Sequence, residues 1–131
     1  MLNVKKILTK ILTELTTLDS YDYIVERGYS GIWTYRKWKS GTVDCFGNTT
    51  VASNTYSANN GAKNIVESLP SGLFNNVSIV NVSGKINGNI QTDIGFTEVS
   101  TTSVQTYLIN RATSSITNTG TVYWHVIGVW K

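Results

Sequence analysis

The residues that could carry chemistry in this chain are few and widely spaced. The one histidine, His125, lies in the segment VYWHVIGVW, and the one cysteine, Cys45, alternates with Val43. A metal site with three protein ligands needs several histidines, cysteines or clustered carboxylates, whereas the eight acidic residues are scattered singly. We therefore expect no metal site, a structural role for His125, and a buried Cys45 that behaves as a small apolar residue.

The sequence also lacks the short motifs that mark catalytic sites. No nucleophile-elbow motif accompanies His125, and neither a phosphate-binding loop nor a dinucleotide fingerprint is present. A pair of carboxylates for glycoside cleavage stays open, because the fold could bring distant acids together. The acids in question are Asp44, Glu67, Asp93 and Glu98. The sequence predicts a protein that is not an enzyme and that needs no cofactor.

Aromatic and basic residues concentrate in the stretch YSGIWTYRKWKSGTVDCFG, residues 29–47. A period of two places Trp33 and Tyr35 on one face of a strand, and Arg36 and Trp38 on the other. The Lys-Ser-Gly that follows predicts a tight turn with glycine at positive φ, so the stretch reads as a hairpin. Core packing, sugar stacking and single-strand nucleic-acid binding all stay open for these rings. Because the rings and cations are divided between the two faces of the strand, core packing is the favoured role for the rings.

Composition and periodicity predict that the rest of the chain is also made of strands. Only 15% of the residues are charged, while serine, threonine and asparagine together make up 44 of the 131 residues, a composition typical of β proteins with many turns. Further strands are predicted at 49–56, 77–83, 95–101, 104–110 and 121–130. With turn clusters between them, they indicate an antiparallel sandwich or barrel. We predict a mainly β fold, an antiparallel β-sandwich over residues 23–131.

Residues 1–19 have a helical period instead. Apolar side chains recur at the 4-3-4-3 spacing of a coiled coil, which makes a stripe along one short amphipathic helix. The stripe consists of Val4, Leu8, Ile11, Leu15 and Leu18. A helix of about four turns is marginal alone in water, so the stripe needs a partner, either its own domain or another copy. Its separation from the β-like remainder favours an N-terminal oligomerisation helix.

Charge and hydropathy limit the classes of partner. The net charge is +3 without any block of five like charges, which permits a nucleic-acid partner but does not indicate one. Lys10 and Glu14 interrupt the N-terminal apolar run, and no apolar segment approaches the roughly 20 residues of a membrane span. We expect no nucleic-acid partner, no membrane insertion and no standard export signal.

The order of the sequence anchors resembles a known family. The resemblance rests on three stretches in this order: YIVERGYSGIWTYRKWKSGTVDCFG, SLPSGLF and a closing VYWHVIGVWK. The chain is similar to the C-terminal domain of minor structural and tail-fibre proteins of phages that infect Gram-positive bacteria. The resemblance covers residues 23–131. Phe46 stands where the family usually has tryptophan, and Val129 where arginine is common.

The resemblance implies a virion protein at the tail tip or another external appendage. In this interpretation the chain is a homotrimer in contact with other virion proteins, and it binds a host cell-wall polysaccharide during attachment without catalysis. A second interpretation is a structural virion module that binds other phage proteins, such as a capsid decoration, a head fibre or a baseplate adaptor. Mixed valine, isoleucine and leucine in the helical stripe do not themselves distinguish a dimer from a trimer.

Loops carry binding residues on rigid β scaffolds, so the glycan site is predicted in a turn. The segment NTYSANNGAKN, residues 54–64, offers the candidates Tyr56, Asn59, Asn60 and Lys63. A tyrosine ring can cover the apolar face of a sugar, asparagine amides can bond vicinal hydroxyls, and the lysine can meet a phosphate. An ordinary solvated turn has the same composition. The alternative segments for the site are 85–89 and 115–120.

Overall fold

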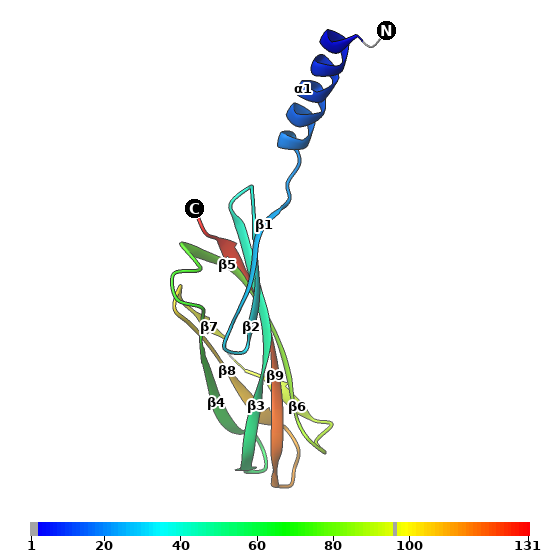
Figure 1. Ribbon diagram of the computed structural model, residues 1–131. Helices are drawn as coiled ribbons and strands as arrows, with labels where there is room; N and C mark the ends of the chain where they lie inside the picture. Colours follow the sequence, from blue (N-terminus) through cyan, green and yellow to red (C-terminus); the bar gives the residue numbers. More distant parts are fainter. Residues whose placement is uncertain (1–2, 96) are drawn as a thin grey trace.

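The computed structural model describes residues 3–95 and 97–131, with the side chains of residues 16–20 left out. One helix, α1 (Val4–Ser20), projects from one end of an elongated β domain, and the C-terminus lies at that same end (Figure 1). The helix begins where Asn3 caps it: the Asn3 side-chain oxygen accepts a hydrogen bond from the backbone N–H of Lys6 at 3.2 Å.

The strands form two antiparallel sheets that face each other (Figure 1). The first has five strands in the order β1-β2-β3-β9-β5, with bounds β1 Ile24–Ser30, β2 Trp33–Trp38, β3 Thr42–Tyr56, β9 Ile116–Val129 and β5 Asn76–Ile86. The second has the order β4-β8-β6, with β7 also paired to β8, and bounds β4 Gly61–Ser68, β8 Ser103–Asn110, β6 Thr92–Ile94 and β7 Glu98–Val99. The predicted mainly β sandwich with one N-terminal helix is confirmed.

Strands β3 and β9 form the longest ladder of the molecule. Their pairing runs from Thr42 opposite Val129 to Tyr56 opposite Ile116, with one register shift between Val51 and Asn54. β9 pairs with β5 on its other side, so it is held by hydrogen bonds along both edges. The two long strands extend the sheet from the helix end to the opposite end of the sandwich (Figure 1).

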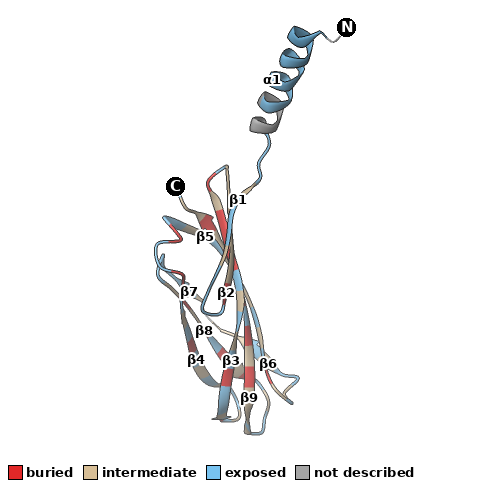
Figure 2. Cartoon of the chain, viewed as in Figure 1, coloured by how far each residue is buried: buried red, intermediate tan, exposed pale blue. Residues whose placement is uncertain are grey.

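The core lies between the sheets, on the inward positions of this ladder (Figure 2). Val43, Cys45, Val122, Trp124 and Val126 alternate with residues that point outward, and all five are buried. The period of two seen in the sequence is thus the period of burial. The predicted burial of Cys45 is confirmed, and burial raises the pKa of its thiol to about 12.

The indole N–H groups of both core tryptophans donate hydrogen bonds inside the sandwich. Trp33 donates to the carbonyl of Ser68 at 2.7 Å, and Trp124 donates to the Thr49 hydroxyl at 2.9 Å. The Thr49 hydroxyl in turn donates to Glu67 at 2.8 Å. Each ring therefore fills the core and also ties the two sheets together. The interpretation of the aromatic hairpin residue Trp33 as core is confirmed.

Two expectations about strands are corrected. The predicted strand at 95–101 is wrong in extent, because among the described residues only Glu98–Val99 is a strand there. β4 was not predicted, since its inward positions include Lys63 and Glu67, which break the apolar alternation. β4 is an edge strand, and both side chains are half-buried there, with Glu67 bonded to the Thr49 hydroxyl of the facing sheet.

On the outward face of the five-stranded sheet, Asp44 joins three strands. Its carboxylate accepts a two-pronged bond from the Arg36 guanidinium, at 3.0 and 2.5 Å, and lies 2.9 Å from the His125 Nε2. Only 5% of Asp44 is exposed. Burial alone would raise the pKa of Asp44, but the hydrogen bonds and charges of Arg36 and His125 hold it below its ordinary value of 3.8.

Asp44 should make the fold sensitive to acid. A carboxyl with a lower pKa in the folded than in the unfolded state stabilises the fold above its ordinary pKa and loses that contribution as the pH falls through the folded value. We expect Asp44→Asn to lower the free energy of unfolding by about 1.5–3 kcal/mol at pH 7, because charged hydrogen bonds are lost. The difference from wild type should shrink below pH 4. Urea unfolding at several pH values measures it, and a difference that is constant from pH 7 to pH 2 would contradict this assignment.

Candidate binding site at the distal loops

Three turns meet at the end of the sandwich away from the helix (Figure 1). They are residues 57–60 between β3 and β4, 87–91 between β5 and β6, and 111–115 between β8 and β9. We call this group of turns the distal tip. The predicted site at 54–64 and both alternatives, 85–89 and 115–120, lie at or beside it. The sequence therefore identified three parts of one surface without showing that they adjoin.

Asn110, at the end of β8, holds the distal tip together. It is buried, and its side-chain amide donates to the carbonyls of Tyr56, Ser57 and Ser114 at 3.0–3.3 Å. Its side-chain oxygen accepts bonds from the Asn89 amide at 2.7 Å and from the backbone of residue 112 at 2.9 Å. One buried side chain thus bonds to all three turns. This hydrogen-bond network restrains the three turns relative to one another.

Asn59 and Asn60 form the outer turn of the tip. Both are exposed and have positive φ, 56° and 83°, a conformation that asparagine tolerates better than most residues. Their backbone N–H groups donate to the carbonyls of Ala112 and Asn110, both at 2.8 Å. Asn59 is thus exposed while its backbone N–H is bonded within the protein. These two predicted site residues are therefore brought together on the surface.

Arg111 links this turn to β6. Its guanidinium donates to the Asn60 side-chain oxygen at 2.8 Å and to the Asp93 carboxylate at 2.9 and 3.1 Å. The hydrogen bonds from Arg111, with the backbone N–H of Ile94, lower the pKa of Asp93. The positive charge of Arg111 is thereby matched by a carboxylate at the surface. The tip offers neutral amide and hydroxyl groups rather than an uncompensated charge.

Ile90 is a candidate site residue that sequence reasoning missed. It stands at the outer end of the β5–β6 turn with its side chain 101% exposed. The turn beneath it is ordered, because Asn89 accepts a bond from the backbone of Gln91 at 2.8 Å, and Gln91 accepts one from the backbone of Arg111. A fully exposed isoleucine on a fixed turn, beside asparagine amides, can cover an apolar patch of a ligand. Nothing in the Asn-Gly-Asn-Ile sequence itself distinguishes this position from a core residue.

Two of the predicted site residues do not lie on this surface. Tyr56 was expected to be exposed, and this is wrong: 1% of it is exposed, at the end of β3 in the core. A period of two from Val43 and Val51 would direct Tyr56 outward, but the register shift between Val51 and Asn54 turns it into the core. Lys63 is not in a loop but in β4, where it is half-buried opposite Leu108. The cationic group expected for an anionic polymer is therefore absent from the turn of residues 57–60.

The described part of the apolar stripe of α1 is exposed at the other end of the molecule. Its described side chains, Val4, Leu8, Ile11 and Leu15, are exposed, as are the flanking Ile7 and Leu12 (Figure 2). The side chain of Leu18 lies outside the described residues. Packing of the stripe against its own β domain, one of the two alternatives, is not what the structure shows. The apolar face of the described part of the helix is therefore exposed to solvent.

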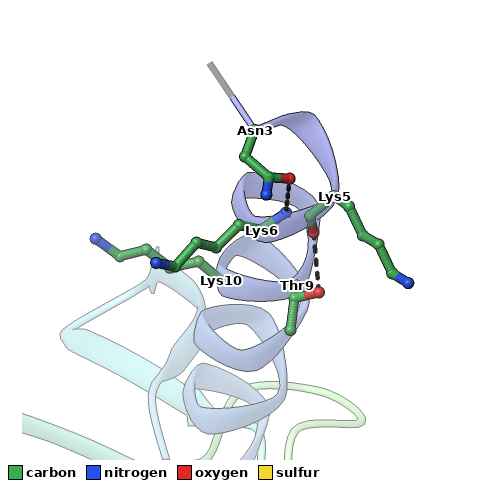
Figure 3. A pocket seen from close by; sticks show the side chains of 5 residues that line it. All are labelled: Asn3, Lys5, Lys6, Thr9 and Lys10. Atoms are coloured by element: carbon green, nitrogen blue, oxygen red, sulfur yellow. Dashed lines mark hydrogen bonds between the residues drawn. The ribbon is translucent and has the colours of Figure 1, made fainter. Parts of the chain in front are cut away.

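The first turns of α1 carry basic side chains around the cap. Lys5, Lys6 and Lys10 extend outward beside Asn3 and Thr9 (Figure 3). The Thr9 hydroxyl donates back to the carbonyl of Lys5 at 3.0 Å, so it is used within the helix. Among the described residues, no helix is long and apolar enough to cross a membrane, and no group of three possible metal ligands comes together.

Comparison with known proteins reveals likeness in fold. No family model and no curated protein matches the sequence. A structure of the C-terminal part of the R1 pyocin fibre of P. aeruginosa matches 82% of this chain with a TM-score of 0.60 and 11% identity, and this chain covers 28% of that one. An N-truncated R1-type pyocin tail fibre matches 89% of this chain with a TM-score of 0.62 and 10% identity, with 94% of that chain covered.

At these identities the likeness shows the fold. The β domain has the architecture found in pyocin tail fibres, in line with the resemblance to tail-fibre domains seen in the sequence. The more specific resemblance, to phages of Gram-positive bacteria, stays a prediction. The chain spans less than a third of the first matching structure, so that protein's assembly and partners are not transferred to it.

Asn110 should determine how rigid the distal tip is. We expect Asn110→Ala to lower the free energy of unfolding by about 2–6 kcal/mol, since it removes about four hydrogen bonds, two N–H groups shared among three carbonyls and two bonds to the oxygen, at about 0.5–1.5 kcal/mol each. Amide exchange should speed up first at the backbone N–H groups of Asn59, Asn60 and Ala112. The matched control is Asn64→Ala, an exposed asparagine of β4. Equal exchange rates in both variants would show that Asn110 does not hold the loops.

Proposed function

We propose that this chain is a phage tail-fibre or baseplate protein that attaches to a glycan of the host cell surface without catalysis. One observation carries the proposal: an exposed apolar helix stands at one end of a rigid β-sandwich, and a fixed cluster of polar turns stands at the other. This arrangement suits a protein that assembles through one end and presents the other. The fold shared with pyocin tail fibres supports it.

The chemistry of the distal tip favours a neutral part of a glycan. Asparagine amides provide both donors and acceptors for neighbouring hydroxyls, and Ile90 provides an apolar contact. Arg111 is already paired with Asp93, so the tip has little to offer an anion. Weak single sites of this kind gain strength when several copies are displayed together, which links the tip to the helix.

A second candidate function is a structural virion module that binds other phage proteins. It is favoured by the outward face of the four-stranded sheet, where Val66 and Tyr107 are exposed. Interface centres are depleted in charge and enriched in aromatic residues. An adaptor of this kind should co-purify with virion proteins and fail to bind cells, whereas an attachment protein should bind cells directly.

The helix should make the protein an oligomer, and we expect a trimer. Burial of five apolar positions per chain at about 1.5–3 kcal/mol each gives a gross driving force that can exceed the cost of association. Light scattering should show a mass of three chains for wild type and one chain for Leu8→Asp/Leu15→Asp. The control is Lys6→Asp/Thr13→Asp, which adds two acidic groups at the same spacing away from the stripe and should remain a trimer. A monomeric wild-type protein would exclude helix-mediated assembly.

The distal tip should carry attachment. We expect Asn59→Gly/Ile90→Ser to reduce adsorption of the labelled trimer to whole bacterial cells at least about tenfold, because glycine keeps the positive φ while the amide and the apolar contact are removed. The Asn64→Ala variant should adsorb like wild type. Equal melting temperatures confirm that the fold is intact. Unchanged adsorption by the tip variant would remove these residues from the site.

A further inference from the structure

A small hollow lies on the outward face of the five-stranded sheet, far from the distal tip. It has a volume of about 130 Å³ and opens between β1, β2 and β3. The outward side chains around it are Arg27, Tyr29, Thr34, Arg36 and Phe46. All five stand on paired strands rather than on loops, so their backbones are fixed.

Two arginines face each other across this hollow. Arg27 and Arg36 are direct cross-strand partners in the β1–β2 ladder, a placement in which like charges repel. Arg36 is compensated, because Asp44 holds its guanidinium by two hydrogen bonds. Arg27 is exposed and has no hydrogen-bond or ion-pair partner among the described residues. The remaining charge of the hollow is therefore positive, with a free guanidinium at its edge.

Two exposed aromatic rings lie in the cross-strand row next to that of the free arginine, one on each side of Thr34. Tyr29 is 85% exposed, and Phe46, on the next strand but one, is 41% exposed. The Phe46 ring is oriented from both sides: the Arg36 guanidinium lies 5.5 Å from its centre, and His125 meets it edge to face at 6.4 Å. Large exposed rings at fixed positions have an apolar face to offer a ligand.

We propose that this hollow binds an acidic sugar unit, with the carboxylate or phosphate held by the guanidinium of Arg27 and the sugar ring set against Tyr29 and Phe46. A guanidinium is suited to either anion because its planar fork can donate two parallel hydrogen bonds. The Thr34 hydroxyl, also in the hollow, can bond a sugar hydroxyl.

A single-stranded nucleic acid also combines phosphates with rings that stack, but the observations favour a sugar. Nucleic-acid sites follow the backbone with a groove of several cations. Here one uncompensated arginine borders a hollow too small for a row of bases. The inference concerns a surface separate from the distal tip. Its failure would leave the attachment proposal intact, and the failure of attachment would leave this site intact.

The test is direct binding by purified wild-type protein, followed by NMR or by quenching of the intrinsic fluorescence. The probes are glucuronic acid, glucose 6-phosphate, neutral glucose and a short oligothymidylate. We expect both acidic sugars to bind at least about tenfold more tightly than glucose, with NMR shifts at Tyr29 and Phe46. Arg27→Ala should weaken the acidic sugars about tenfold or more, since bonds to charged groups are lost. Arg27→Lys should fall between the two.

Two controls separate this site from general charge effects. Lys85→Ala removes a cation from β5 on the same sheet and should leave binding unchanged, and Tyr29→Ala should weaken acidic sugars and glucose alike. The proposal is overturned if glucuronic acid binds no better than glucose, if the shifts map to the distal tip, or if Arg27→Ala binds like wild type. Tighter binding of oligothymidylate than of either acidic sugar would assign the hollow to nucleic acid instead.

Discussion

The hydrogen-bonded ladder between β3 and β9 is the constraint on which the rest of the structure depends. It sets the length of the sandwich, and it places the alternating residues Val43, Cys45, Trp124 and Val126 in the core. Its register also decides the outward face: Phe46 lies opposite His125, and Asp44 is brought within reach of that histidine, 81 residues away in sequence. A slip of one residue would exchange the two faces along the whole ladder.

The sequence was sufficient for features that depend on local periodicity. The 4-3-4-3 stripe predicted α1, and the alternation around Trp33 and Cys45 predicted a hairpin with these residues inside. Glycine at the hairpin turn was also predicted, and Gly41 has a φ of 101°. These features need only neighbours in the chain, so one sequence reveals them.

Features that depend on long-range contact were not predictable in the same way. Asparagine is a residue type typical of exposed turns. Asn110 is nevertheless buried, because backbone carbonyls of Tyr56 and Ser114 surround its side chain. Tyr56 lies next to a polar turn and looked exposed, but the ladder directs it inward. The outward group of Arg36, Asp44 and His125 is assembled from three strands. Its members are individually ordinary in sequence.

The direction of the strands has a mechanical consequence. The chain enters the sandwich from α1 at one end, where both oxygens of the Asp22 carboxylate hold the backbone and hydroxyl of Ser40, at 2.9 and 2.8 Å. The strands then run lengthwise toward the opposite end (Figure 1). Tension between the helix and the far loops therefore loads the β1–β2 ladder in shear rather than peeling it open. Many hydrogen bonds must break at once, so resistance to pulling depends on the rate of unfolding rather than on any single bond.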